Sequence, residues 1–349
     1  MGAASAPGAD IIIRAASAYW DAEAARRKEQ ITLEHKSDTQ SNAEKKSWQE
    51  VIAKAHADWR DGISQGRLVE RREPPKQLFL PGFKEETVRA IPNHLARSSL
   101  FSPIRRGRRK CYIDETLVSR SDAEIHFWGQ QLDEADADVW MQAVREAMKA
   151  PLGAPVVINR AEFLRQIGRR HGKTGYDWLE QSMKRLAFAM LTMIVRRKNG
   201  SIKMQVGEPP IEGQEELCFH LVGDWKMNKK TNSYELTMSP TLMAFFRGKE
   251  YALLDWRKRL AITGRGQDLA KAIQRLVATS NNSVQTYTLK WLKAKMSYTG
   301  KEWNFKQHLV RACQELVRVD VIKRYDIADN THGQEQLTIY VQNYDVSPS

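Results

Sequence analysis

Three groups of residues have types and spacings that resemble parts of enzyme active sites. Residues 168–174 are one residue short of the Gly-x-x-x-x-Gly-Lys-Thr loop that holds phosphates. They are expected to join two helices, whereas that loop joins a strand to a helix. His308 and Arg311 form a His-x-x-Arg pair. In strand-transfer enzymes such a pair holds the scissile phosphate for a tyrosine, for which Tyr340 or Tyr344 would be the candidate.

The spacing of these residues argues against catalysis. Only 43 positions (308 − 265) separate His308 from Arg265, the other arginine that strand transfer would need, which leaves little room for a catalytic sheet. The 8 histidines are scattered singly and form no metal-binding pattern. We therefore expect no catalytic residues, no metal, no cofactor and no enzymatic activity.

The charge of the chain indicates a polyanionic partner. Its 349 residues include 55 Lys and Arg against 42 Asp and Glu, a formal net charge of +13. The excess is concentrated: residues 151–200 carry 10 basic and 3 acidic side chains, and residues 251–300 and 76–112 carry 9 and 2 each. Two of these blocks overlap or adjoin the repeated pattern described next.

A pattern of helix, Gly-containing turn, basic helix and basic strand occurs twice. A fixed shift of 127 residues superposes Leu164 on Trp291, Tyr176 on Trp303, and Val195 on Ile322 (322 − 195 = 127). A helix, a turn, a second helix and a hairpin describe a winged helix, whose second helix enters the DNA major groove. Two copies predict two DNA-reading heads in one chain.

The expected fold class is α+β, with two tandem winged-helix domains behind a helical, partly flexible arm. We expect the arm at 1–75, a basic linker at 76–112, the first winged helix at 113–238 and the second at 239–349. Three separated cysteines indicate a reducing compartment, and the early apolar run Ile11–Ile13 is too short to span a membrane. The expected location is the cytoplasm.

The reading residues follow from helical periodicity. In both heads, apolar side chains should face the core and polar ones the groove, while wing residues hold the DNA backbone. The first-head candidates are Lys173, Thr174, Gln181, Lys184 and Arg185, with Arg196, Arg197 and Lys198 on the wing. The second-head candidates are Lys301, Asn304, Gln307, His308 and Arg311, with Lys323 and Arg324 on the wing. Tyr176 and Trp303 either contact DNA sugars or pack at the start of their helices.

Several stretches resemble the TrfA family of plasmid replication initiators. They are Gln77-Leu78-Phe79-Leu80, Arg89-Ala90-Ile91-Pro92-Asn93, Ala96-Arg97-Ser98-Ser99-Leu100-Phe101 and the segments 151–156, 175–176 and 251–258. The resemblance covers about residues 76–345 and implies binding to directly repeated double-stranded DNA (iterons) at a plasmid origin. It further implies origin opening, contact with single-stranded origin DNA, and recruitment of the host initiator, replicative helicase and sliding clamp. A homodimer in equilibrium with an active monomer is also implied.

One peptide departs from the family pattern. The family's clamp-binding motif is Gln-Leu-x-Leu-Phe, and this chain has Pro81 at the fifth position. Gln77, Leu78, Leu80 and Phe83 are therefore either a clamp-binding peptide or an anchor of the linker on the first domain.

Two alternatives to an initiator remain open from the sequence. A winged-helix transcriptional regulator would bind an inverted repeat as a stable dimer, whereas two unlike heads on one chain suit a direct repeat. A tyrosine-type strand-transfer enzyme would form a covalent adduct with DNA.

Overall fold

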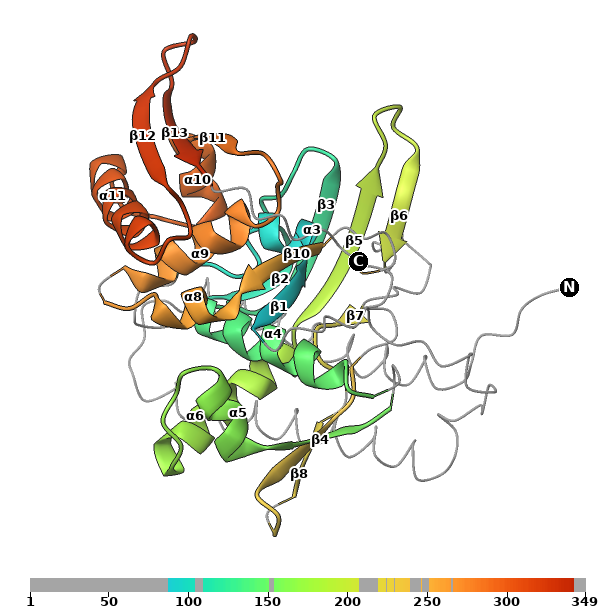
Figure 1. Ribbon diagram of the computed structural model, residues 1–349. Helices are drawn as coiled ribbons and strands as arrows, with labels where there is room; N and C mark the ends of the chain where they lie inside the picture. Colours follow the sequence, from blue (N-terminus) through green and yellow to red (C-terminus); the bar gives the residue numbers. More distant parts are fainter. Residues whose placement is uncertain are drawn as a thin grey trace, which may run out of the picture. The chain divides into compact units, whose positions relative to one another are not determined.

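The computed structural model describes residues 87–103, 109–150, 154–206, 219–223, 225–228, 230–238, 246, 251–264 and 266–341. All of these belong to one compact unit (Figure 1). The expected arm at 1–75, the peptide with Gln77, Leu78, Leu80 and Phe83, and the residues Arg265 and Tyr344 lie outside the described residues.

The C-terminal part of the chain is a winged helix, here called the second head. Its elements are α9 (Gln267–Val277), β11 (Val284–Thr288), α10 (Leu289–Lys295), α11 (Glu302–Arg318), β12 (Arg324–Asp329) and β13 (Glu335–Tyr340). β13 lies between β11 and β12 in an antiparallel sheet. This order makes α11 the recognition helix and the β12–β13 hairpin the wing, called the second wing.

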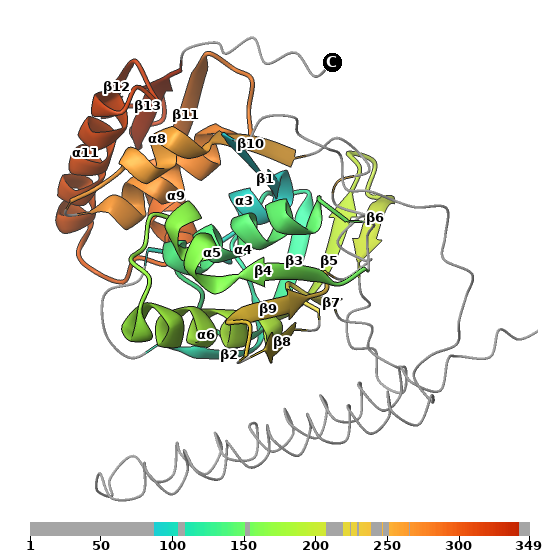
Figure 2. The ribbon, with the colours of Figure 1, turned by 60° about the horizontal axis from the view of Figure 1, so that its bottom comes forward.

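The first head repeats the same order with a long insertion. Its elements are α4 (Glu134–Ala147), β4 (Val156–Asn159), α5 (Arg160–Gln166), α6 (Lys173–Ala187), β8 (Trp225–Asn228) and β9 (Ser233–Leu236). β9 lies between β4 and β8, as β13 lies between β11 and β12 (Figure 2). The predicted α+β class with two winged helices is confirmed, and α6 is the recognition helix of the first head.

The insertion corrects the sequence repeat. β5 (Met190–Arg196), β6 (Ile202–Val206) and β7 (Phe219–His220) lie between α6 and β8 and belong to another sheet, with β2 (Cys111–Thr116) and β3 (Ala123–Gln130). Val195 pairs with Ala123 of β3, so it is not the counterpart of Ile322. The wing of the first head is instead the β8–β9 hairpin, called the first wing. The helices of the two copies match, but the strands after them do not.

The segment expected to be a basic linker contributes to the core. β1 (Val88–Pro92) pairs antiparallel with β10 (Tyr251–Asp255), and α3 (Asn93–Arg97) follows it. Ile91, Leu95 and Phe101 are almost completely buried. These apolar positions are scattered among the basic residues of 76–112, so the average composition of the block conceals them.

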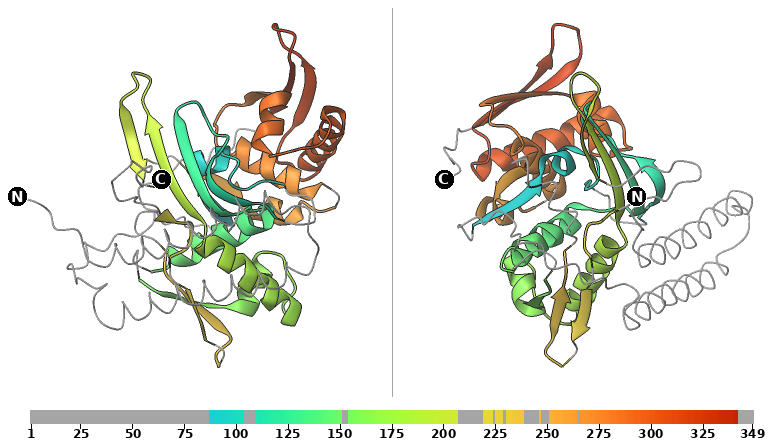
Figure 3. Two further views of the ribbon diagram at one scale, coloured as in Figure 1. Left: turned by 180° about the vertical axis from the view of Figure 1, so that it is seen from behind. Right: turned by 90° about the vertical axis from the view of Figure 1, so that its right-hand side faces the viewer.

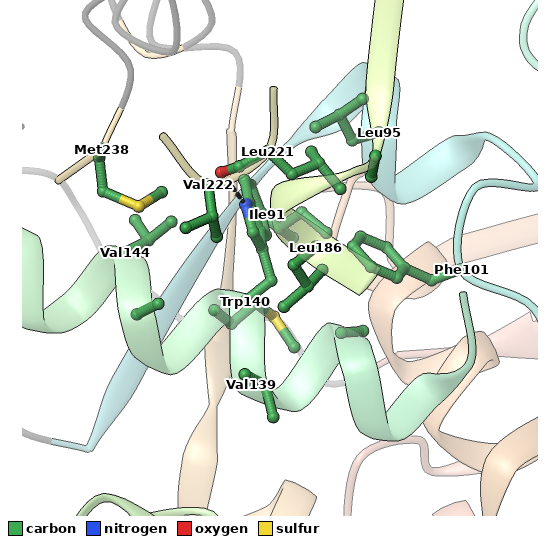
Figure 4. Close-up of a cluster of buried hydrophobic side chains, with 14 of the residues drawn as sticks. Ile91, Leu95, Phe101, Val139, Trp140, Val144, Leu186, Leu221, Val222 and Met238 are labelled. Carbon is green, nitrogen blue, oxygen red and sulfur yellow. Dashed lines mark hydrogen bonds between the residues drawn. The ribbon is translucent and has the colours of Figure 1, made fainter. Parts of the chain in front are cut away.

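Trp140 of α4 lies at the centre of the larger core (Figure 4). Its side chain is fully buried, packs near Phe101, and donates a hydrogen bond from Nε1 to the carbonyl oxygen of Leu221 at 2.9 Å. A buried indole N–H without a partner would be costly, so this bond fixes the chain just after β7 against α4.

Buried ion pairs join α4 to α9 of the second head and to the helix that precedes α9. Glu134 accepts hydrogen bonds from Arg259 of α8 (Trp256–Ala261), at 3.0 Å, and from Arg275 of α9. Asp138 pairs with Arg259 at 2.5 Å and with Lys271 at 2.7 Å. The side chains of Glu134, Arg259 and Arg275 are completely buried. Burial alone would raise the pKa of Asp138, but the Arg259 and Lys271 charges hold it below its ordinary value. These five side chains form the α4 ion network.

Replacing Glu134 with Gln should destabilise the fold strongly. Arg259 and Arg275 would keep their charges in the interior without a carboxylate, which typically costs about 3 to 5 kcal/mol. Urea unfolding followed by Trp fluorescence measures the loss. The matched change at exposed Glu162 should stay within about 0.5 kcal/mol. Equal stability of the two variants would contradict the role given to the network.

Candidate nucleic-acid interface

The outward face of α11 is polar and exposed. Phe305, Leu309, Cys313 and Leu316 are buried, as the helical spacing predicted. The candidate readers Lys301, Gln307, His308 and Arg311 are exposed, and Asn304 is half-buried. The helix thus presents amide, imidazole, ammonium and guanidinium groups, which suit base edges and phosphates.

The turn before α11 orients its first residues. A Cβ on Gly300 would lie 2.6 Å from the Tyr298 ring, so a larger residue at this position would force the ring to move. Tyr298 packs on Phe305 with ring centroids 5.1 Å apart, and its hydroxyl lies 3.3 Å from Nδ1 of His308. His308 is therefore held at one edge while its ring remains accessible.

Trp303 stands out on this surface because it is 68% exposed. Packing at the helix start, one of the two interpretations of this residue, is therefore wrong for Trp303. In the first head the corresponding Tyr176 is half-buried, with the Arg160 guanidinium 4.2 Å from its ring centroid. The two aromatic residues match in sequence but have different environments.

Fewer side chains of α6 are exposed than its helical periodicity predicted. Lys173, Thr174 and Gln181 are exposed, and half-buried Lys184 pairs with Glu180 at 2.9 Å. The preceding segment 168–174 joins α5 to α6, with Gly168 and Gly172 at φ 71° and 133°. As the sequence indicated, it joins two helices, where a nucleotide loop would join a strand to a helix.

Arg185 does not face outward, which corrects its assignment as a reader. Its Nη2 donates to Oδ1 of Asp136 at 2.7 Å, and its Nε lies 3.2 Å from both carboxylate oxygens. Ser182 Oγ at 2.6 Å and Arg109 Nη1 at 2.9 Å complete the site around Asp136, which is fully buried. Burial alone would raise the pKa of Asp136, but Arg185 and Arg109 lower it. Arg185 therefore fastens α6 to α4.

The predicted wing residues of the first head lie on another hairpin. Arg196, Arg197 and Lys198 are exposed, but they connect β5 to β6 in the inserted sheet. On the first wing the exposed basic residues are Lys226 and Lys230, which the sequence analysis missed. A signal was present, since two short alternating strands flank an Asn- and Lys-rich turn at 228–232.

The second wing is basic at its base and acidic further out. Lys323 and Arg324 are exposed, and the Arg324 guanidinium stacks 3.7 Å from the centroid of the Tyr340 ring. Asp326 and Asp329 are exposed further along β12. The predicted backbone contacts are thus confined to the base of this wing.

Figure 1 shows α6 and α11 on the same side of the unit. Their exposed polar faces make up the candidate interface, together with the basic residues of the two wings. Within the described ranges, no group of three or more His, Cys, Asp or Glu side chains is placed to hold a metal ion. No helix in those ranges has the length and apolar composition needed to cross a bilayer.

This chain is similar in sequence to a known plasmid replication initiator. No protein-family model matches this chain. The plasmid replication initiator protein TrfA of Escherichia coli is 24% identical over 243 residues, which are 66% of this chain and 57% of TrfA. The expected resemblance to TrfA is confirmed. This chain spans little more than half the length of that relative.

Two solved structures superpose on part of this chain. RctB domains 2-3 superpose with a TM-score of 0.41 at 12% identity, covering 71% of this chain and 96% of that one. The Pi initiator protein in complex with iteron DNA gives 0.39 at 9% identity, covering 60% and 96%. The winged-helix assignment rests on the element order and sheet order described above.

Replacing Arg311 and Arg185 with Ala should affect different properties. Arg311→Ala should weaken duplex binding by about 1 to 3 kcal/mol if its guanidinium reads a base. Arg185→Ala should lower the free energy of unfolding by about 1 to 3 kcal/mol, because Asp136 loses a buried partner. Fluorescence anisotropy on duplex DNA and urea unfolding separate the two. A DNA defect for Arg185→Ala at full stability would restore it as a reader.

Proposed function

We propose that this protein binds directly repeated duplex DNA at a plasmid origin and initiates replication there, without making or breaking a covalent bond. The observation that carries the proposal is the presence of two winged-helix heads in one chain, each with an exposed polar recognition helix. Similarity to TrfA supports the plasmid-initiator role. The net charge of +13 supports a nucleic-acid ligand.

Each head has a division of labour in this proposal. In the second head, Gln307, His308 and Arg311 read base edges, while Lys301 and Lys323 hold phosphates. Trp303 adds an apolar surface that suits a deoxyribose or a thymine methyl group. In the first head, Gln181 reads bases, and Lys173 and Thr174 lie at the helix start, where phosphate is favoured.

A direct repeat is favoured over a palindrome because the heads differ. α6 exposes Lys173, Thr174 and Gln181. α11 exposes a larger set of side chains, which includes Trp303. One chain therefore reads an asymmetric site, and tandem copies of that site have the same polarity. The regulator alternative needs two identical half-sites, and the strand-transfer alternative needs a nucleophilic tyrosine. The Tyr340 ring is stacked under Arg324.

The resemblance adds partners to the proposal. We include the host initiator, the replicative helicase, the sliding clamp and single-stranded origin DNA as partners, with a dimer that dissociates into the active monomer. Pull-down of purified sliding clamp with the full chain, comparing wild type with a Leu78→Ala/Leu80→Ala variant, tests the peptide at 77–83. Equal capture by both would assign the peptide to linker anchoring.

Binding to the selected DNA site should depend steeply on salt. If 6 to 10 phosphates are contacted, affinity should fall roughly 10³- to 10⁵-fold between 50 and 200 mM salt. The DNA site is first selected from random duplexes. Affinity is then compared for duplexes that carry two copies of this site in direct or in inverted orientation. A scrambled duplex is the control for specificity. A preference for inverted pairs would support the regulator, and a covalent protein–DNA adduct would support strand transfer.

A further inference from the structure

The two wings expose side chains of opposite charge. On the second wing, Asp326 and Asp329 are exposed on β12, the edge strand of its sheet. On the first wing, Lys226 is exposed on β8, also an edge strand, and Lys230 is exposed in the following turn. Two topologically equivalent hairpins have thus become acidic in one head and basic in the other.

The acidic charges of the second wing are poorly suited to DNA. Carboxylates near a phosphate backbone are repelled, and a wing that only held DNA would be expected to carry lysine or arginine there. The third carboxylate of this hairpin, Glu335, is paired with Lys306 of α11. Asp326 and Asp329 have no such pair among the described residues, and they lie opposite Thr338 and Glu335 across the hairpin.

The first wing presents its lysines in a defined place. Asn228 accepts hydrogen bonds through Oδ1 from the backbone N–H groups of Lys230, at 3.0 Å, and Thr231, at 3.3 Å. These bonds fix the turn that carries Lys230. Lys226 lies opposite Glu235, which is half-buried, whereas Lys226 itself is exposed.

The wings project from opposite ends of the described unit, as the views in Figures 1 and 3 show. Both belong to this one unit, and the ion pairs of Glu134 with Arg275 and of Asp138 with Lys271 hold its two heads together. Copies placed in the same direction along DNA would therefore bring the second wing of one copy toward the first wing of the next.

We propose that the second wing of one copy contacts the first wing of its neighbour on tandem direct repeats, with Asp326 and Asp329 facing Lys226 and Lys230. This head-to-tail contact rests on the direct-repeat binding proposed above. It is heterologous, so it extends along an array of repeats without closing into a ring. Its partner is a second copy of this chain.

A contact between exposed charges is weak in free solution and effective on DNA. Solvent screens such pairs, so the contact does not hold two free copies together. Two copies bound to adjacent repeats have a high effective concentration for each other, so the same contact then stabilises the bound pair. We expect a cooperativity on the order of tenfold, and it should shrink as salt is raised.

The test compares one repeat with two. For wild-type protein, the second of two adjacent repeats should fill on the order of tenfold more tightly than a single repeat. Asp326→Asn/Asp329→Asn should bind one repeat at least as tightly as wild type but lose this gain. The matched control, Asp114→Asn/Glu115→Gln, removes two exposed carboxylates of β2, a strand of the sheet that contains neither wing, and should keep it.

Charge exchange identifies the partner surface. Asp326→Lys/Asp329→Lys and Lys226→Glu/Lys230→Glu should each abolish cooperativity, and the fourfold variant that combines them should regain it. Affinities are expressed relative to each variant's own single-repeat value, so that lost phosphate contacts do not count. Inserting about 5 bp between the repeats turns the neighbour to the other side of the duplex and should abolish the gain for wild type.

The outcomes separate the inference from the proposed function. Failure to bind any single repeat specifically would overturn the proposed function. Normal single-repeat binding without cooperativity in the wild-type protein would overturn the wing contact, and so would cooperativity that is unchanged in the Asp326→Asn/Asp329→Asn variant. The pairing would also be overturned if both charge-exchange variants lost cooperativity and the fourfold variant that combines them did not regain it.

Discussion

The α4 ion network is the constraint on which the arrangement of the two heads depends. Glu134 and Asp138 stand on the first helix of the first head, and their partners Arg259, Arg275 and Lys271 stand on α8 and α9. Charges without water must be paired, so each head neutralises the other's buried groups. A two-headed protein with a flexible joint would pay the entropy of ordering at each binding event, whereas a fixed pair of heads presents both helices together.

The same chemistry operates around the recognition helix of the first head. Asp136, also on α4, binds Arg185 and Ser182 of α6 and Arg109 near β2. One helix, α4, thus positions α6 on one side and the second head on the other. An arginine that looks like a DNA reader is used for this purpose, which leaves Gln181, Lys173 and Thr174 as the exposed candidate readers of the first head.

Sequence periodicity gave the helices of both heads and their buried faces, because the apolar residues of an amphipathic helix recur at fixed intervals. It failed at the strands. β5 continues directly from α6 and begins a basic hairpin, so it looks like a wing, but its backbone pairs with β3. The partner of a strand depends on contacts with residues remote in sequence. Alternation of apolar and polar residues predicts a strand but does not identify its partner. Lys226 and Lys230 were missed for this reason.

By itself, the sequence determined the number of heads, the two recognition helices, the basic character of the chain and the likeness to TrfA. Each of these follows from local spacing or composition. Only the tertiary structure decided which polar side chains are available. Arg185 and Arg311 stand on equivalent helices with similar sequence signals, yet one is held by a buried carboxylate and the other is exposed. A side chain's free surface depends on what the fold places beside it, and Asp136 lies 49 positions from Arg185 in the chain.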